Sequence, residues 1–221
     1  MSATPSDVAV AVFARTPVAG AAKTRLIPLL GAEGAAQLQA QLTRLALARA
    51  LAVAPDRTTL WLAGDRAELR DAPGVPVHPQ CGDDLGARMA QAFEALLPQH
   101  DAVLLIGTDC PTQTADDLRD AARALHAHDM VLQPAEDGGY VLIGFARRVL
   151  AHARRWQTVF EGITWGTENV LAQTRARVAD AGMRVAMLDA RPDLDLPQDY
   201  THAVAAGWIT PIGAGAHGER T

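Results

Sequence analysis

The chain has 221 residues, of which 49% are hydrophobic, and a formal net charge of −5 at pH 7. This length and apolar content suit a single α/β domain with one large core rather than two domains. The negative charge, without any run of Lys or Arg, excludes a nucleic acid polymer as a partner. No segment stays apolar for the roughly 18 residues of a membrane span, and two cysteines make no disulfide framework. We therefore expect a cytoplasmic protein without a membrane segment, whose partners are small-molecule substrates.

Apolar runs and helical spacings alternate along the chain. Val8–Ala14 is an unbroken apolar run, which is typical of a parallel strand covered on both faces. Further strands are predicted at Thr58–Ala63, Val75–His78, Ala102–Ile106, Met130–Gln133, Tyr140–Ile143 and Arg184–Leu188, and helices at Gly34–Val53, Leu85–Leu97, Asp116–His126, Glu168–Ala181 and Gln198–Ala206.

This alternation predicts a mostly parallel sheet with right-handed crossovers, in which ligands bind beyond the carboxyl ends of the strands. We expect one domain over residues 1–208. The segment 209–221 has several glycines and no apolar periodicity, so it is expected to be a flexible tail without a role in catalysis.

The loop after the first strand has the composition of a phosphate cradle. It starts at Ala14 and Arg15, and Gly20 permits a tight turn before Lys23 and Arg25. The two cations and several backbone N–H groups can point at one polyphosphate. The loop lacks the spacing of a Walker motif, and a solvated basic turn is the alternative.

A second loop begins at Gln80 and precedes a predicted helix. Gln80 can donate to and accept from a nucleobase edge, and Gly86 lets the backbone approach a ring closely. The alternative is plain helix capping by Asp83 or Asp84.

Acidic residues follow two later strands. Asp109 comes directly after a buried apolar strand, where a carboxylate suits Mg²⁺, although it can also simply start a turn. Asp193 and Asp195 follow the last strand, and side chains two apart in extended chain face the same way, so the two carboxylates can share a metal. If the two carboxylates bind no metal, their mutual repulsion requires that they are exposed to solvent.

Two further loops contain glycine. Asp137-Gly138-Gly139 joins two strands, which predicts a tight hairpin, although the glycines also allow the chain to pass beside an acceptor substrate. Thr167 is the expected N-cap of the following helix, and Trp165 is expected to pack against the core.

Taken in order, these motifs resemble an uncharacterised bacterial glycosyltransferase-like family, of the radical-SAM/selenodomain-associated transferase type. The resemblance spans about Val8 to Ala206 and is carried by Phe13-Ala-Arg-Thr-Pro17 with Gly20 and Lys23-Thr-Arg-Leu26, Gly82-Asp-Asp-Leu-Gly-Ala-Arg-Met89, Gly107-Thr-Asp-Cys-Pro111, Pro134-Ala-Glu-Asp-Gly-Gly-Tyr140 and Trp165-Gly-Thr167. That family is similar to nucleotidyltransferases of the glycosyltransferase-A fold, such as molybdenum-cofactor and phospholactate guanylyltransferases. The resemblance therefore implies a Rossmann-like nucleotide-diphospho-sugar transferase fold with helices on both faces of the sheet.

The resemblance also implies roles for the candidate residues. Lys23 and Arg25 hold a nucleoside triphosphate, Gln80, Leu85 and Gly86 line the base pocket, and Asp109 coordinates Mg²⁺ or Mn²⁺, with Asp193 or Asp195 as a second ligand. Where the related enzymes carry a Gly/Thr/Asn-rich acceptor loop, this chain has Asp137-Gly-Gly-Tyr140.

The implied reaction is nucleotidyl transfer to a small phosphorylated or hydroxyl acceptor, with release of pyrophosphate. A glycosyltransferase that uses a nucleotide-sugar donor, and an inactive nucleotide- or partner-binding protein, are the alternatives.

Overall fold

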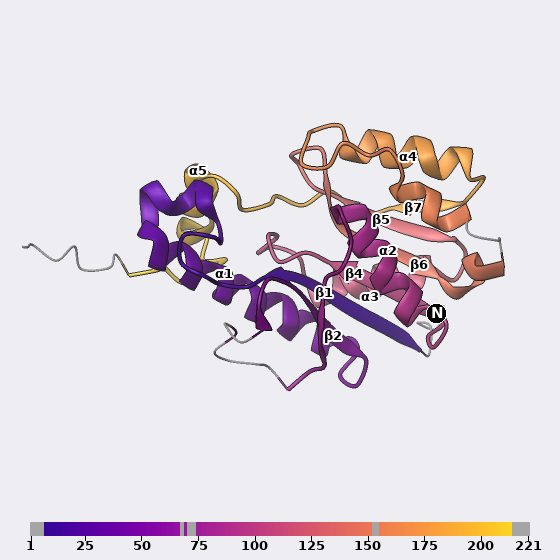
Figure 1. Ribbon diagram of the computed structural model, residues 1–221, viewed down its shortest axis with the longest axis horizontal. Helices are drawn as coiled ribbons and strands as arrows, with labels where there is room; N and C mark the ends of the chain where they lie inside the picture. The colour runs from indigo at the N-terminus through magenta and orange to yellow at the C-terminus, as the bar shows by residue number, and fades with distance from the viewer. Residues whose placement is uncertain (1–6, 67–68, 70–73, 152–154, 214–221) are drawn as a thin grey trace, which may run out of the picture.

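The computed structural model describes residues 7–66, 69, 74–151 and 155–213. Its described strands form one seven-stranded sheet with the order β3-β2-β1-β4-β6-β5-β7 (Figure 1). The strands are β1 (Val8–Arg15), β2 (Thr58–Ala63), β3 (Val77–Pro79), β4 (Ala102–Ile106), β5 (Met130–Pro134), β6 (Tyr140–Ala146) and β7 (Val185–Met187). The helices are α1 (Ile27–Leu51), α2 (Leu85–Leu96), α3 (Ala115–Ala124), α4 (Val170–Asp180) and α5 (Pro197–Ala205), with short 3₁₀ turns at Thr24–Leu26, Arg147–Ala151 and Arg155–Phe160.

The sheet is mostly parallel, as the alternation of elements predicts. β1 pairs in parallel with β2 and β4, β2 with β3, and β5 with β7. Among the described strands only β6 runs the other way, between β4 and β5. The loops after β1, β3, β4 and β7 and the β5–β6 hairpin therefore all lie at one edge of the sheet.

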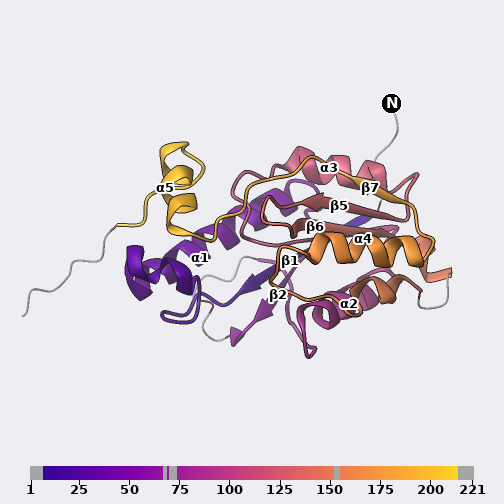
Figure 2. The same cartoon turned by 90° about the horizontal axis from the view of Figure 1, so that it is seen from above.

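Helices cover both faces of the sheet (Figure 2). One face packs against α1 and α3, through residues such as Leu47 and Leu118. The other face packs against α2, α4 and the 3₁₀ turn Arg155–Phe160, through Phe93, Trp156 and Phe160. Residues that alternate along β1 enter these two separate cores, which explains why that strand is apolar throughout.

The first part of α1 and α5 form a small third cluster beyond the sheet (Figure 1). The chain turns at Gly31, whose φ of 70° and ψ of 168° are not helical, so α1 consists of two helical pieces that meet at this residue. Leu26, Leu38 and Tyr200 are buried in this cluster. The expected helical start at Gly34 is therefore too late, because one helical turn, 27–30, precedes the break and the second piece begins directly after it.

The segment after α5 differs from the expected flexible tail. Ile209 is buried in the third cluster, and the N–H of Ile212 donates to Tyr200 Oη at 2.9 Å. Residues 209–213 thus pack against the domain through isolated apolar side chains, which leave no periodic signal, and residues 214–221 lie outside the described part. No described helix combines the length and apolarity needed to cross a membrane.

Candidate functional site

Lys23 is the centre of the site. Its backbone has φ 46° and ψ 47°, which makes it the sole non-glycine residue with positive φ in the described chain. Its ammonium Nζ lies 2.5 Å from Leu194 O, 2.8 Å from Asp109 Oδ1 and 3.4 Å from Asp195 Oδ1. The Lys23 side chain is only 4% exposed. Loops that follow β1, β4 and β7 therefore meet at one ammonium group.

Arg25 lies on the solvent side of this centre. Its Nη1 is 2.6 Å from Asp195 Oδ2, and its side chain is 65% exposed. A guanidinium has five N–H donors, so Arg25 can hold Asp195 and still bind an anion that arrives from solvent. Gly20, with φ 80° and no other described atom within 4 Å of a Cβ built there, makes the turn that leads the chain to Lys23.

Hydrogen bonds to the backbone and side chain hold Asp109 in position. Its carbonyl accepts the N–H of Leu194 at 2.7 Å, and its carboxylate accepts from Thr108 Oγ1 at 3.2 Å. Arg49 of α1 donates to the carbonyls of the next two residues, Cys110 and Pro111. The carboxylate itself remains half exposed. Asp109 therefore has a fixed backbone and an accessible charge.

Asp193 and Asp195 have different surroundings. Asp195 pairs with Lys23 and Arg25. Asp193 is half buried, and burial, with the nearby charge of Asp137, raises its pKa to about 6. Asp199, the third carboxylate of this segment, accepts the N–H groups of Asp195 and Leu196 and so holds the start of α5.

Of the three expected metal ligands, Asp109 and Asp195 both contact the Lys23 ammonium. Within the described residues, no group of three or more His, Cys, Asp or Glu side chains could hold a metal ion. The oxygens around Lys23, from two carboxylates and the Leu194 carbonyl, are nevertheless the donors that a hard divalent cation prefers. The donor chemistry of Asp109 and Asp195 thus fits Mg²⁺ or Mn²⁺, which commonly takes one or two carboxylates together with substrate phosphates.

The expected base-pocket residues are engaged mainly with the protein. Gln80 Nε2 donates to Ala14 O at 3.2 Å and Trp61 O at 3.0 Å, and so ties together the ends of β1 and β2. A Cβ at Gly86 would lie 2.7 Å from Trp165 Cζ2, so the close approach here is to a tryptophan of the protein. Leu85 is 42% exposed.

Capping at the start of α2 comes from Asp84, whose Oδ1 accepts the Ala87 N–H at 2.7 Å. The capping interpretation of this loop therefore holds for Asp84. At α4 the N-cap residue is Asn169 rather than the expected Thr167. Thr167 donates to Thr164 O at 2.8 Å in the preceding turn, and its Oγ1 accepts the Asn169 N–H at 3.4 Å.

The Asp137-Gly-Gly segment forms the predicted hairpin. The Ala135 N–H donates to Gly139 O at 3.1 Å, and Asp137 Oδ1 accepts the Gly139 N–H at 2.9 Å. Gly138 has φ 89°, and its carbonyl accepts the Leu171 N–H of α4 at 2.9 Å. The glycines therefore serve a turn that packs on α4.

Arg15 is exposed at the carboxyl end of β1, at the same edge of the sheet as the hairpin.

A cavity of about 620 Å³ adjoins Asp195. Arg25, Asp137, Asp193, His202 and Trp208 are among its lining residues. It lies between Arg25 and Asp195, the β5–β6 hairpin and α5.

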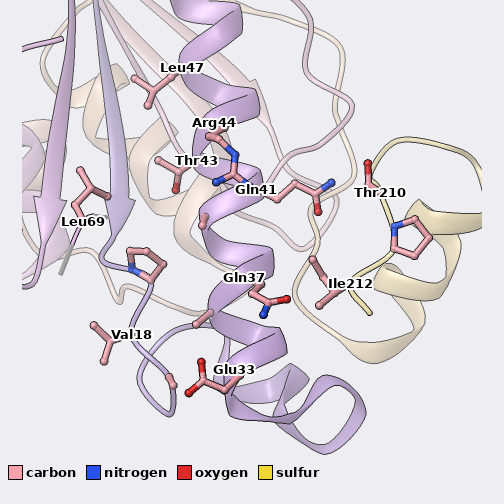
Figure 3. A pocket seen from close by; sticks show the side chains of 15 residues that line it. Val18, Glu33, Gln37, Gln41, Thr43, Arg44, Leu47, Leu69, Thr210 and Ile212 are labelled. Carbon is pink, nitrogen blue, oxygen red and sulfur yellow. The ribbon is translucent and has the colours of Figure 1, made fainter. Parts of the chain in front are cut away.

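A second cavity, of about 740 Å³, lies along the outer face of α1 (Figure 3). Gln37, Gln41 and Arg44 project from the helix there, opposite Thr210 and Ile212. Glu33 is its one lining carboxylate among the described residues, whereas Asp195 lines the first cavity. The cavity at Asp195 is therefore the better candidate for a substrate-binding site.

Two supporting residues were not foreseen. Arg49 buttresses the loop after Asp109, and Arg191 Nη2 bonds Asp117 Oδ1 of α3 at 2.6 Å. Burial raises the pKa of Asp117, but hydrogen bonds from Arg191 and Thr114 outweigh it and leave the pKa lowered. Arg49 could have been noticed in the sequence, because it takes a position in the helical spacing that is otherwise filled by apolar residues.

Solved structures of transferases share this fold. The chain superimposes with a TM-score of 0.80 and 28% identity on a proposed nucleotide-diphospho-sugar transferase from Desulfovibrio desulfuricans G20, over 90% of this chain and 87% of that one. It also matches CMP:2-keto-3-deoxy-manno-octonic acid synthetase complexed with CTP, with TM-score 0.60, 14% identity and coverage of 91% and 98%. A third match is 4-diphosphocytidyl-2C-methyl-D-erythritol synthase from Anaerococcus prevotii DSM 20548, with TM-score 0.57, 12% identity and coverage of 90% and 97%.

The fold is therefore that of the nucleotide-diphospho-sugar transferases, as expected from the sequence. Residues 37–167 match the family of uncharacterized proteins conserved in bacteria known as DUF2064, and the chain belongs to that family. No curated protein matches the sequence.

Proposed function

We propose that this protein is a cytoplasmic, Mg²⁺- or Mn²⁺-dependent nucleotidyltransferase. It transfers a nucleotidyl group from a nucleoside triphosphate to a small phosphorylated or hydroxyl acceptor and releases pyrophosphate. The observation that carries the proposal is the meeting of Lys23, Asp109 and Asp195 at the carboxyl edge of the sheet. Solved structures that share the fold include cytidylyltransferases, which supports the general kind of reaction.

In this reaction the chain binds and orients the reactants. Arg25, exposed beside Lys23, receives the β- and γ-phosphates, and Lys23 joins it in neutralising the leaving pyrophosphate. Asp109 and Asp195 would hold the divalent cation, which would supply positive charge beside the reacting phosphate oxygens. Gln80 and the backbone near Gly86 stay the candidate contacts to the base.

The acceptor attacks the α-phosphorus in line with the departing pyrophosphate, so no nucleophilic side chain is required. The cavity of about 620 Å³ beside Asp195 offers room for a small acceptor. The β5–β6 hairpin, with Asp137 and Glu136, lines one side of it.

A second candidate is glycosyl transfer from a nucleotide-sugar. It is favoured by the 28% identity to the proposed nucleotide-diphospho-sugar transferase. The same cation site would then neutralise a leaving nucleoside diphosphate.

Product analysis separates the two. Each of the four common nucleoside triphosphates is incubated with Mg²⁺ and a panel of phosphorylated and hydroxyl acceptors, and pyrophosphate is measured. Asp109→Asn should lower the rate by at least about 100-fold. Asp116→Asn, at an 84% exposed side chain on α3, is the matched control and should retain the rate.

Transfer of sugar from nucleotide-sugars, without pyrophosphate release from any triphosphate, would support the second candidate instead. An Asp109→Asn variant with the full rate would remove this carboxylate from the reaction. Tight nucleotide binding without any product would indicate a binding protein.

A further inference from the structure

Lys23 already occupies the position of a cation. Its ammonium is enclosed by three oxygens, from Leu194 O at 2.5 Å, Asp109 Oδ1 at 2.8 Å and Asp195 Oδ1 at 3.4 Å. The ammonium donates hydrogen bonds to Leu194 O and Asp195 Oδ1, and its contact with Asp109 is an ion pair. With 4% of the side chain exposed, little of the charge faces water.

The backbone holds the lysine in this position. Lys23 adopts the left-handed conformation, which is unfavourable for a residue with a side chain, and its carbonyl accepts the Leu26 N–H at 2.9 Å. This local strain is balanced by the buried contacts of the ammonium. The pairing is therefore a built feature of the loop rather than a chance surface ion pair.

Two cations cannot share these oxygens. A divalent ion between Asp109 and Asp195 would stand within a few ångströms of the ammonium, and like charges at that distance repel strongly in a partly buried site. We propose that Lys23 is the resident cation of the nucleotide-free protein, and that it must leave the two carboxylates before a divalent ion can bind them. This inference rests on the proposed function in that the triphosphate supplies the new partner of Lys23.

The lysine has the means to move. Its four-carbon stem is flexible, and its ammonium is a compact charge that pairs as readily with phosphate as with carboxylate. Arg25, the other cation of the loop, pairs with the second oxygen of the Asp195 carboxylate, Oδ2, and its side chain is 65% exposed. Metal and triphosphate therefore enter together, and nucleotide-free protein binds divalent ions poorly.

The test titrates Mn²⁺ alone, without nucleotide, and measures free Mn²⁺ by electron paramagnetic resonance. Wild type should bind weakly, and Lys23→Met, which keeps the length of the side chain but not its charge, should bind roughly 10- to 100-fold more tightly. Arg25→Met is the matched control, since it also removes one positive charge from Asp195 but leaves Lys23 in place. It should gain much less affinity than Lys23→Met.

The gained affinity must depend on the carboxylates, so Lys23→Met combined with Asp109→Asn should lose it. A purely structural role of Lys23 would not create metal binding that requires Asp109. Circular dichroism checks that each variant folds, and Lys23→Gln replaces Lys23→Met if the latter does not.

The proposal is overturned if the folded Lys23 variants gain no Mn²⁺ affinity over the Arg25 control. It is also overturned if wild type without nucleotide binds Mn²⁺ tightly and Asp109→Asn abolishes that binding, a result that needs no Lys23 variant. Both readouts are independent of pyrophosphate release. A failure of the nucleotidyltransferase assay is therefore distinguishable from a failure of this inference.

Discussion

Alanine at Gly138 should destabilise the protein far more than alanine at the next residue, Gly139. Gly138 has φ 89°, and a Cβ there would lie 2.1 Å from the carbonyl oxygen of Glu168. Gly139 needs no positive φ, and its Cβ would meet only Asp137 Oδ1 at 3.1 Å, the end of a side chain that can move aside. The two adjacent glycines therefore make a matched pair.

The expected difference follows from two terms. A left-handed backbone costs a residue with a Cβ about 1–2 kcal/mol. Relieving the overlap with the Glu168 backbone costs about 1–3 kcal/mol more, since it shifts the hairpin away from α4. Gly138→Ala should thus lose about 2–5 kcal/mol, and the hydrogen bond from Leu171 to Gly138 O should weaken with it.

Urea unfolding followed by tryptophan fluorescence measures both variants against wild type. Gly139→Ala is expected to stay within about 1 kcal/mol of wild type. Equal stability of the two variants would refute the structural role of the hairpin glycine. A loss of nucleotide binding without loss of stability in Gly138→Ala would point to contact with a ligand instead.

Three further predictions concern the site and its supports. The folded pKa of Asp193, about 6, exceeds its ordinary 3.8, so stability falls as pH rises through this window. Asp193→Asn should therefore gain roughly 1 kcal/mol at pH 7.5, after allowance for solvent screening, and nothing below about pH 4; urea titrations with chelator at both pH values check this, and equal gains at both would contradict it. Gly86→Ala should lose about 1–3 kcal/mol through overlap with Trp165, measured by thermal unfolding. Unchanged stability with weaker nucleotide binding would show that Gly86 acts through contact with the base and not through packing on Trp165. Arg49→Leu removes the Arg49 donors to the carbonyls of Cys110 and Pro111 and should lose about 1–3 kcal/mol, with a lower rate of pyrophosphate release. Unchanged stability and rate would show that these two hydrogen bonds are not needed to hold the loop.

The strands were the part of the fold most accessible from sequence. Residues 8–14 and Ala102–Ile106 are buried on both faces, and their unbroken apolar runs carry that information locally. The start of α1 was missed because Gly31 interrupts the helix with a positive φ. The short helical turn before the glycine therefore does not continue the apolar spacing of the longer piece after it.

The candidate site was accessible only in part. The sequence predicts that Lys23, Asp109 and Asp195 lie in loops that follow strands, and therefore at one edge of the sheet. Their direct ion pairs were not foreseen, because Lys23 and Asp195 are 172 positions apart and only the folded backbone sets which side chain fills the centre. The packing of Ile209 and Ile212 was missed for a similar reason, since single apolar residues between Gly and Pro give no period.

The most direct measurement of the central claim is a thermal-shift panel of nucleoside triphosphates and nucleotide-sugars, with and without Mg²⁺. A ligand at about 100 times its dissociation constant stabilises the folded state by about 2.7 kcal/mol, which raises the melting temperature of a chain of this size by several degrees. The account predicts that at least one triphosphate gives a Mg²⁺-dependent shift in wild type, and that Asp109→Asn and Asp195→Asn each abolish it. A shift that persists in both variants, or the absence of any shift across the panel, would contradict it.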